Sequence, residues 1–239
     1  MGFLASAMSI LLTALYSIIN NYGITIIVLT VLVRAILIPL YAKQQRYTLA
    51  MAELQPKINE IQTRYAADRE KMNEELNKVY SEVGASPLTG CLPMVIQLPI
   101  IMGLYTLLRN PLAYMIGDNA EKMAVAVHES FLWISDLSQT DPWILPVLAG
   151  VTTYFSFSAQ QSDSSPNAGN ASMKAMKYFF PVMIFLMGRT FPASLALYWA
   201  IGNLVTMAQQ KIINKMNAKK KLKNEVKEEV RKSRKEARG

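Results

Sequence analysis

Residues 22–41 read YGITIIVLTVLVRAILIPLY and carry a single charge, Arg34. Apolar residues fall on every face of a helix drawn through this stretch, and a helix buried in a soluble protein would instead show one apolar stripe with a polar face opposite. A stretch of about 20 apolar residues is long enough to cross a bilayer. The stretch therefore predicts a transmembrane helix that contains an arginine.

Other stretches of the chain are also nearly free of charge. They lie at residues 88–108, 142–161 and 178–208. The basic residues are concentrated between and after them, because 42–87, 162–177 and 211–239 hold 21 of the 25 Lys and Arg residues. Cytoplasmic loops carry an excess of Lys and Arg, so these three segments are predicted to be cytoplasmic.

The same rule fixes the rest of the topology. Residues 109–141, with five acids against two bases, are predicted to form an outer loop. A single crossing by 178–208 would leave the basic tail outside, so this stretch is predicted to cross twice, with an outer turn at 189–194. Its spans, 178–188 and 195–210, are short, and short spans thin the bilayer around them. The fold class is then an all-α polytopic membrane protein with five transmembrane helices.

Two polar segments have helical or interfacial character. In 42–87 apolar residues recur at helical spacing on both sides of a junction near Ala66, which predicts a cytoplasmic helical hairpin instead of a plain spacer. Residues 1–21 carry no charge and lack the basic start of a secretory signal. They are expected to be retained as an outer interfacial segment, with the N-terminus outside and the tail 211–239 in the cytoplasm.

Arg34 is costly where it stands, since an arginine at the centre of a span costs about 2.5 to 3.5 kcal/mol on insertion scales. Its side chain could snorkel to the headgroups. An ion pair within the membrane is excluded, because none of the predicted spans contains Asp or Glu. The remaining interpretation is a water-filled cavity open to the cytoplasm.

Polar residues on the other spans are suitable neighbours for such a cavity. Helical spacing puts Thr30 on the Arg34 face, and a polar face recurs every three or four residues along the last span. The candidate groove residues are Arg34, Thr30, Gln97, Thr152, Thr153, Ser156, Trp199, Asn203, Thr206 and Gln210. One positive charge in a wet groove would attract acidic or polar segments of another molecule.

Motifs for catalysis or for cofactor binding are not found. The sequence has no HExxH, GxSxG or phosphate-binding loop, and its one histidine lies in the predicted outer loop. We therefore expect no enzyme, no cofactor and no metal. Two alternatives remain, a small transporter or channel that uses Arg34 as an anion site, and a structural subunit of a translocon.

Several stretches of the chain form a distinctive set: NYG at 21–23, LVRAILIPL at 32–40, LQPK at 54–57, GCLPMVIQLPI at 90–100, YFFP at 178–181 and LYWAIGN at 197–203. Together they resemble the YidC/Oxa/Alb family of membrane protein insertases, in the five-span form found in Gram-positive-type bacteria. The resemblance covers about residues 22–215.

The resemblance implies a location in the bacterial plasma membrane and a groove closed on the outer side and open to the cytoplasm and the lipid. Arg34 corresponds to the groove arginine, Trp199 to a polar groove position, and the third-span position is Ser156 in this chain. The implied partners are nascent membrane proteins, the ribosome and the Sec translocon. The basic tail suits contact with ribosomal RNA or with anionic lipids.

Overall fold

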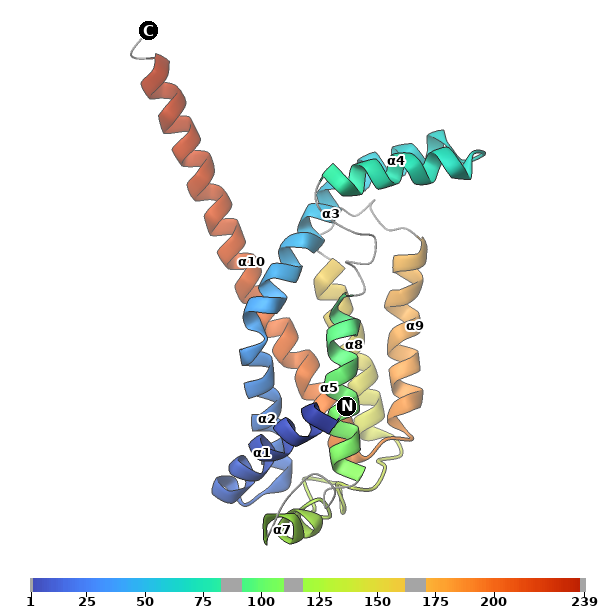
Figure 1. The fold of residues 1–239 in the computed structure, drawn as a ribbon, viewed down its shortest axis with the longest axis vertical. Helices are drawn as coiled ribbons and strands as arrows, with labels where there is room; N and C mark the ends of the chain where they lie inside the picture. The colour runs from blue at the N-terminus through green and yellow to red at the C-terminus, as the bar shows by residue number, and fades with distance from the viewer. Residues whose placement is uncertain (1, 83–91, 110–117, 162–170, 237–239) are drawn as a thin grey trace.

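The computed structural model describes residues 2–82, 92–109, 118–161 and 171–236. They form helices joined by loops, with no named strand in these ranges and one isolated bridge between Phe131 and Ile134. In chain order the helices are α1 (Gly2–Ile19), α2 (Tyr22–Ile36), α3 (Ile38–Arg64), α4 (Arg69–Glu82), α5 (Leu92–Arg109), α7 (Asp118–Ala126), α8 (Ile144–Gln161), α9 (Ala171–Gly188) and α10 (Ala193–Glu236). Figure 1 shows α2, α5, α8, α9 and the first part of α10 as a bundle, with α1 across its lower end.

The predicted span 22–41 consists of two helices. The end of α2 and the start of α3 meet at Leu37 with a bend of 53°. Pro39 explains why the helix breaks here. Proline has no N–H to donate to the carbonyl of Ala35 one turn earlier, so one helical hydrogen bond across the break is missing. Among the described residues this bent pair is long and apolar enough to cross a membrane, whereas no single unbroken helix is.

Other helix ends also differ from the predicted segments. Helix α9 begins at Ala171, within the predicted loop 162–177, and α10 continues without a break past residue 210 to Glu236. The tail is thus helical where the prediction assigned only a charged segment. Residue 1 of the predicted interfacial segment, the start of the predicted span 88–108, parts of the predicted hairpin, outer loop and cytoplasmic loop, and the end of the tail lie outside the described residues, at 1, 83–91, 110–117, 162–170 and 237–239.

A helical hairpin follows the bend. Helices α3 and α4 pack on one another and are separated by a turn after Arg64. Lys57 and Glu82 form an ion pair across them at 3.0 Å, with both side chains exposed. Exposed pairs contribute about 0 to 1 kcal/mol, so this contact adds little to the stability of the hairpin. In Figure 1 the hairpin projects from the bundle at the end opposite α7.

The elbow between α1 and α2 is held by the loop after α7. The Glu129 carboxylate accepts hydrogen bonds from the Tyr16 hydroxyl and from the backbone N–H of Tyr22, at 2.7 Å for the latter. The bond to Glu129, together with burial, raises the pKa of Tyr16 to about 12. Glu129 therefore joins α1, the start of α2 and the loop after α7 at one end of the bundle.

A core of apolar side chains fills the bundle between α1, α2, α5 and α10. Its largest fully buried members include Tyr22, Leu29, Leu104, Leu107 and Tyr198. Helix α8 packs against both α9 and α10, and α10 also packs against α2. The first part of α10 therefore lies at the centre of the bundle, where it can present side chains to α2 on one side and to α8 on the other (Figure 1).

Candidate functional site

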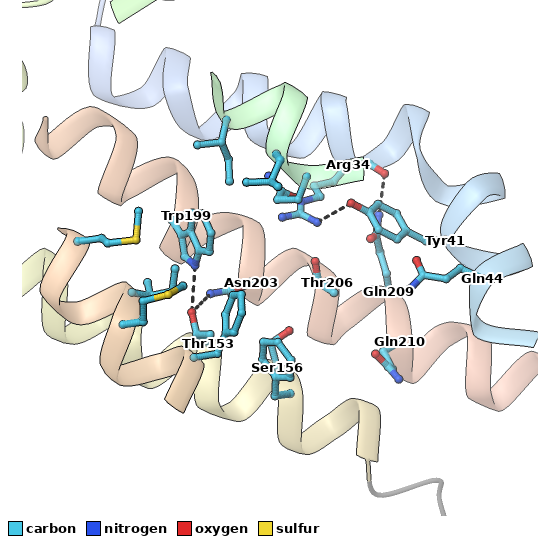
Figure 2. A pocket seen from close by; sticks show the side chains of 18 of the residues that line it. Arg34, Tyr41, Gln44, Thr153, Ser156, Trp199, Asn203, Thr206, Gln209 and Gln210 are labelled. Carbon is cyan, nitrogen blue, oxygen red and sulfur yellow. Dashed lines mark hydrogen bonds between the residues drawn. The ribbon is translucent and has the colours of Figure 1, made fainter. Parts of the chain in front are cut away.

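A cavity of about 440 Å³ lies between the helices of the bundle. Its lining comes from α2, α3, α5, α8, α9 and α10, and from Phe191 in the turn between the last two. Figure 2 shows polar side chains along α10, others on α8, and Arg34 and Tyr41 facing them from α2 and α3.

Arg34 is the only charged residue among the described residues that line this cavity. Its side chain is 7% exposed. One guanidinium nitrogen donates to the Tyr41 hydroxyl at 3.0 Å, and the guanidinium carbon lies 5.6 Å from the centre of the Tyr41 ring. Nε of Arg34 has no hydrogen-bond partner among the described residues. The arginine is thus held by a neutral ring and retains an unused donor.

Close packing of Arg34 on α10 depends on Gly202. A Cβ atom at position 202 would lie 2.8 Å from Nη2 of Arg34 and 3.3 Å from Nε, closer than side chains normally approach. The absence of a side chain on this turn of α10 leaves the space in which the guanidinium lies. Any larger residue at position 202 would displace the guanidinium from this place.

Thr153 is the centre of a second polar cluster in the cavity. Its hydroxyl accepts from Trp199 Nε1 at 3.0 Å and lies 2.8 Å from the Asn203 amide, while it donates to the Ala149 carbonyl at 2.6 Å. The Asn203 amide also lies 3.2 Å from the Thr152 hydroxyl. These bonds join α8 to α10 and fix the orientation of the Trp199 ring at the cavity wall (Figure 2).

A Thr153→Val variant should lower stability and change the environment of Trp199. Valine has a similar shape but cannot accept the indole and amide protons, and an unsatisfied buried polar group costs about 1 to 3 kcal/mol. Trp133 and Trp143 are replaced by Phe so that Trp199 is the only reporter, and its emission spectrum and the thermal unfolding of the protein in detergent are measured. Thr106→Val is the control, because Thr106 is half-buried on α5 and its hydroxyl donates to the Met102 carbonyl of its own helix. An unchanged spectrum and melting temperature would contradict the assigned role of Thr153.

The structure brings together most of the predicted groove residues. Those that line the cavity are Arg34, Gln97, Thr153, Ser156, Trp199, Asn203, Thr206 and Gln210. Thr30 and Thr152 are not among the lining residues. Both hydroxyls donate to the carbonyl four residues earlier in their own helix, that of Ile26 at 2.6 Å and that of Leu148 at 2.7 Å, as Thr often does in helices.

Four polar lining residues were not selected from the sequence. They are Tyr41, Gln44, Gln45 and Gln209. Tyr41 follows Arg34 by seven residues, which is two helical turns, so the spacing alone could have placed both on one face. The glutamines lie in segments that the sequence assigned to the hairpin and to the end of the last span, and only the packing of α3 on α10 brings them into one cavity.

The opposite wall of the cavity is apolar. Helix α9 contributes Phe180, Met183, Ile184 and Met187, and α5 contributes Leu98, Ile101 and Met102. The cavity is therefore amphipathic, with polar residues mainly on α2, α3, α8 and α10 and an apolar side on α9 and on α5, where Gln97 is the one polar lining residue among the described residues. No group of three or more His, Cys, Asp or Glu side chains in the described ranges could hold a metal ion.

Comparison with known proteins shows which family this chain belongs to. The model of a family described as 60Kd inner membrane protein matches residues 14–221. The chain belongs to this family. Among the 60Kd inner membrane proteins, it is 39% identical to the membrane protein insertase YidC of Clostridium perfringens over 210 residues, which are 85% of this chain and 82% of that one.

Further relatives agree on the family. The chain is 39% identical to membrane protein insertase YidC 2 of Listeria innocua over 200 residues, covering 82% of this chain and 64% of the relative. The matched region covers 38% of the length of the YidC of Nitratidesulfovibrio vulgaris. The chain thus spans less than two thirds of the length of both of these relatives.

A solved structure supports the fold of this family member. The chain matches the structure described as "Active YidC insertase crystal structure with the first transmembrane domain resolved", with a TM-score of 0.64 and 28% identity over 85% of this chain and 44% of that one. The predicted resemblance to the YidC/Oxa/Alb family and the all-helical fold are thus confirmed.

Proposed function

We propose that this protein is a membrane protein insertase, which takes segments of nascent membrane proteins into its cavity and releases them sideways into the bilayer. The amphipathic cavity with one buried arginine carries the proposal. The names of the relatives in Clostridium perfringens and Listeria innocua support it. No nucleotide is required in this scheme, because transfer of the substrate's apolar segment into lipid supplies the driving force.

Each wall of the cavity suits one part of such a substrate. An acidic or polar end would lie against Arg34 and the polar face of α10, where Trp199 and Asn203 project. The apolar segment that follows would lie against the apolar side formed by α5 and α9. Because the substrate's two parts contact two walls, the polar end is held while the apolar part passes into the lipid.

The location proposed for the protein is the bacterial plasma membrane, with five spans, the N-terminus outside and the C-terminus in the cytoplasm. Large exposed apolar side chains on the outer faces of the bundle support it, because extended apolar surface marks a membrane or protein contact. Examples are Ile36, Phe155, Phe179, Val182 and Leu186. The short spans in 178–210 would thin the bilayer beside them and shorten the path of the polar end.

Partners beyond the substrate are proposed from charge. Residues 211–239 hold twelve bases against four acids, and α10 continues as a helix through most of this segment. A basic helix of this kind attracts RNA phosphates on a ribosome and anionic lipid headgroups. The Sec translocon is a possible partner through the family resemblance alone.

The rival function, a transporter or channel with an anion site at Arg34, has less support. It explains neither the helical hairpin α3–α4 nor the apolar wall on α5 and α9, and the relatives carry the name insertase. A structural translocon subunit would not need a buried arginine with an unused donor.

Purified protein in liposomes should insert a short single-span substrate that has an acidic end and is made in a membrane-free translation reaction. Inserted substrate is measured as the fragment protected from an external protease. Protein-free liposomes of the same lipids give the spontaneous background. Equal protection in both preparations would contradict unaided insertase activity.

A further inference from the structure

Glutamine side chains gather in one half of the cavity. Gln44 and Gln45 of α3 and Gln209 and Gln210 of α10 all line it. Figure 2 shows Gln44, Gln209 and Gln210 around Tyr41, at the end of the cavity away from Trp199. We call these four residues the amide cluster. It comes from two helices whose sequence positions differ by more than 160 residues, so the fold, and not a local repeat, assembles it.

Hydrogen bonds within the amide cluster use only some of the donors and acceptors of its side chains. Gln210 Nε2 donates to Gln45 Oε1 at 3.3 Å, and Gln209 Nε2 donates to the backbone carbonyl of Arg34 at 3.0 Å. Oε1 of Gln209 is buried and has no hydrogen-bond partner among the described residues. A buried acceptor without a partner costs about 1 to 3 kcal/mol, so a turn of this side chain that brings Oε1 to the N–H of a ligand in the cavity is favoured.

The chemistry of these groups selects the kind of ligand. An amide side chain offers N–H donors and a carbonyl acceptor without any charge. A peptide group offers the same two functions in complementary form, one N–H and one C=O for each residue. Gln209 already makes one such bond, to the main chain of Arg34. An ion or a lipid phosphate would instead be held by opposite charge, and the four glutamines of the amide cluster carry none.

The length of the polar side fits an extended chain. Trp199, Asn203, Thr206 and Gln210 line the cavity from successive turns of α10. At 1.5 Å per residue, this row extends over ~16 Å. An extended chain advances ~3.3 Å per residue, so about five residues would lie along it.

We propose that the amide cluster binds the main chain of an extended substrate segment through hydrogen bonds that do not depend on sequence. Arg34 then selects for acidic side chains, while the amide cluster holds whatever main chain precedes or follows them. This inference rests on the proposed insertase function. It accounts for how one groove with one charge can accept polar ends of different sequences.

The test compares two synthetic substrates that differ only in their main-chain N–H groups. Each is a single-span peptide with an uncharged Gly-Ser end of eight residues, and in one of them alternate residues of that end are N-methylated. Insertion into proteoliposomes containing the full chain is measured by protease protection, after subtraction of the protein-free background. We expect N-methylation to lower protein-dependent insertion about three- to tenfold, as for the loss of one or two hydrogen bonds.

Variants of the protein assign the effect to the amide cluster. Gln209→Met and Gln210→Met, made separately, keep the side-chain size and remove hydrogen bonding. Each should lower insertion of the unmethylated peptide and reduce the difference between the two peptides. Gln62→Met on α3, away from the cavity lining, is the matched control and should behave as the parent protein. Thermal unfolding of each variant checks that it is folded.

The outcomes separate this inference from the proposed function. If neither peptide inserts above background, the insertase function itself is contradicted. If both insert equally, the amide cluster does not bind main chain and the inference is overturned. A difference between the peptides that persists fully in both glutamine variants would also overturn it, because another part of the groove would then bind the main chain.

Discussion

An Arg34→Ala variant is expected to lower the insertion of substrates with an acidic end by roughly 10- to 150-fold. A hydrogen bond to a charged group contributes about 1.5 to 3 kcal/mol, and each 1.4 kcal/mol is about a factor of ten. Arg34 is the only charge in the described lining of the cavity, and its guanidinium donates to the neutral Tyr41 hydroxyl, so a substrate carboxylate would find a positive charge that no acid neutralises. The rate of protease protection in proteoliposomes measures the effect.

Matched substrates and variants isolate the charge. A substrate whose acidic end is changed to Asn and Gln should lose much less insertion in the Arg34→Ala variant. Arg34→Lys should retain part of the activity, because it keeps the charge but not the planar guanidinium that lies beside Tyr41. Arg189→Ala is the control, since Arg189 lies over the Trp143 ring at the α9–α10 turn, away from the cavity lining.

Equal losses for acidic and neutral substrates would show that Arg34 supports the fold and not the recognition of charge. Unchanged insertion of every substrate would show that the arginine is merely tolerated. Either result would contradict the role given to Arg34. Insertion by the unmutated protein in liposomes of the same lipids would still support the insertase function, so the two conclusions are tested separately.

Much of the site could be predicted from helical periodicity. Trp199, Asn203, Thr206 and Gln210 recur every three or four residues, and in the structure all four line the cavity from one face of α10. Periodicity is informative here because the helix is regular throughout. It says less about Thr residues, whose hydroxyls can turn back to their own helix, as those of Thr30 and Thr152 do.

The contacts that hold Arg34 could not be derived in the same way. Pro39 marks a weak point, but the angle of the bend at Leu37, 53°, does not follow from the presence of a proline. In the sequence Gly202 is one small residue in an apolar run, and only the structure shows that the guanidinium of Arg34 packs against it. Likewise, the glutamines of α3 and α10 become neighbours only through tertiary packing. These features depend on distances between helices, which a single sequence does not contain.

A Gly23→Ala variant should lower the stability of the protein by about 1 to 3 kcal/mol, the usual cost of forcing an extra group into a packed interior. A Cβ atom at position 23 would lie 2.2 Å from Cγ of Phe131, so the ring would have to move. The ring has little freedom, because Phe131 and Ile134 exchange backbone hydrogen bonds at 2.8 and 2.9 Å. Glu129, two residues before, is bonded to Tyr16 and Tyr22. Displacing Phe131 would therefore strain the loop that closes this end of the bundle.

A double-mutant cycle with Phe131→Ala tests this explanation directly. Phe131→Ala alone removes the contacts of a partly buried ring and should destabilise the protein, but it also opens the space that a methyl group at position 23 would enter. The double variant should consequently be more stable than the sum of the single effects predicts, with a coupling of about 0.5 to 3 kcal/mol for residues in contact. Thermal unfolding in detergent at one fixed scan rate, followed by tryptophan fluorescence, provides the comparison. Strict additivity would mean that the ring and the glycine do not share this space, and the loop from Glu129 to Ile134 would then need another reason to pack against the start of α2.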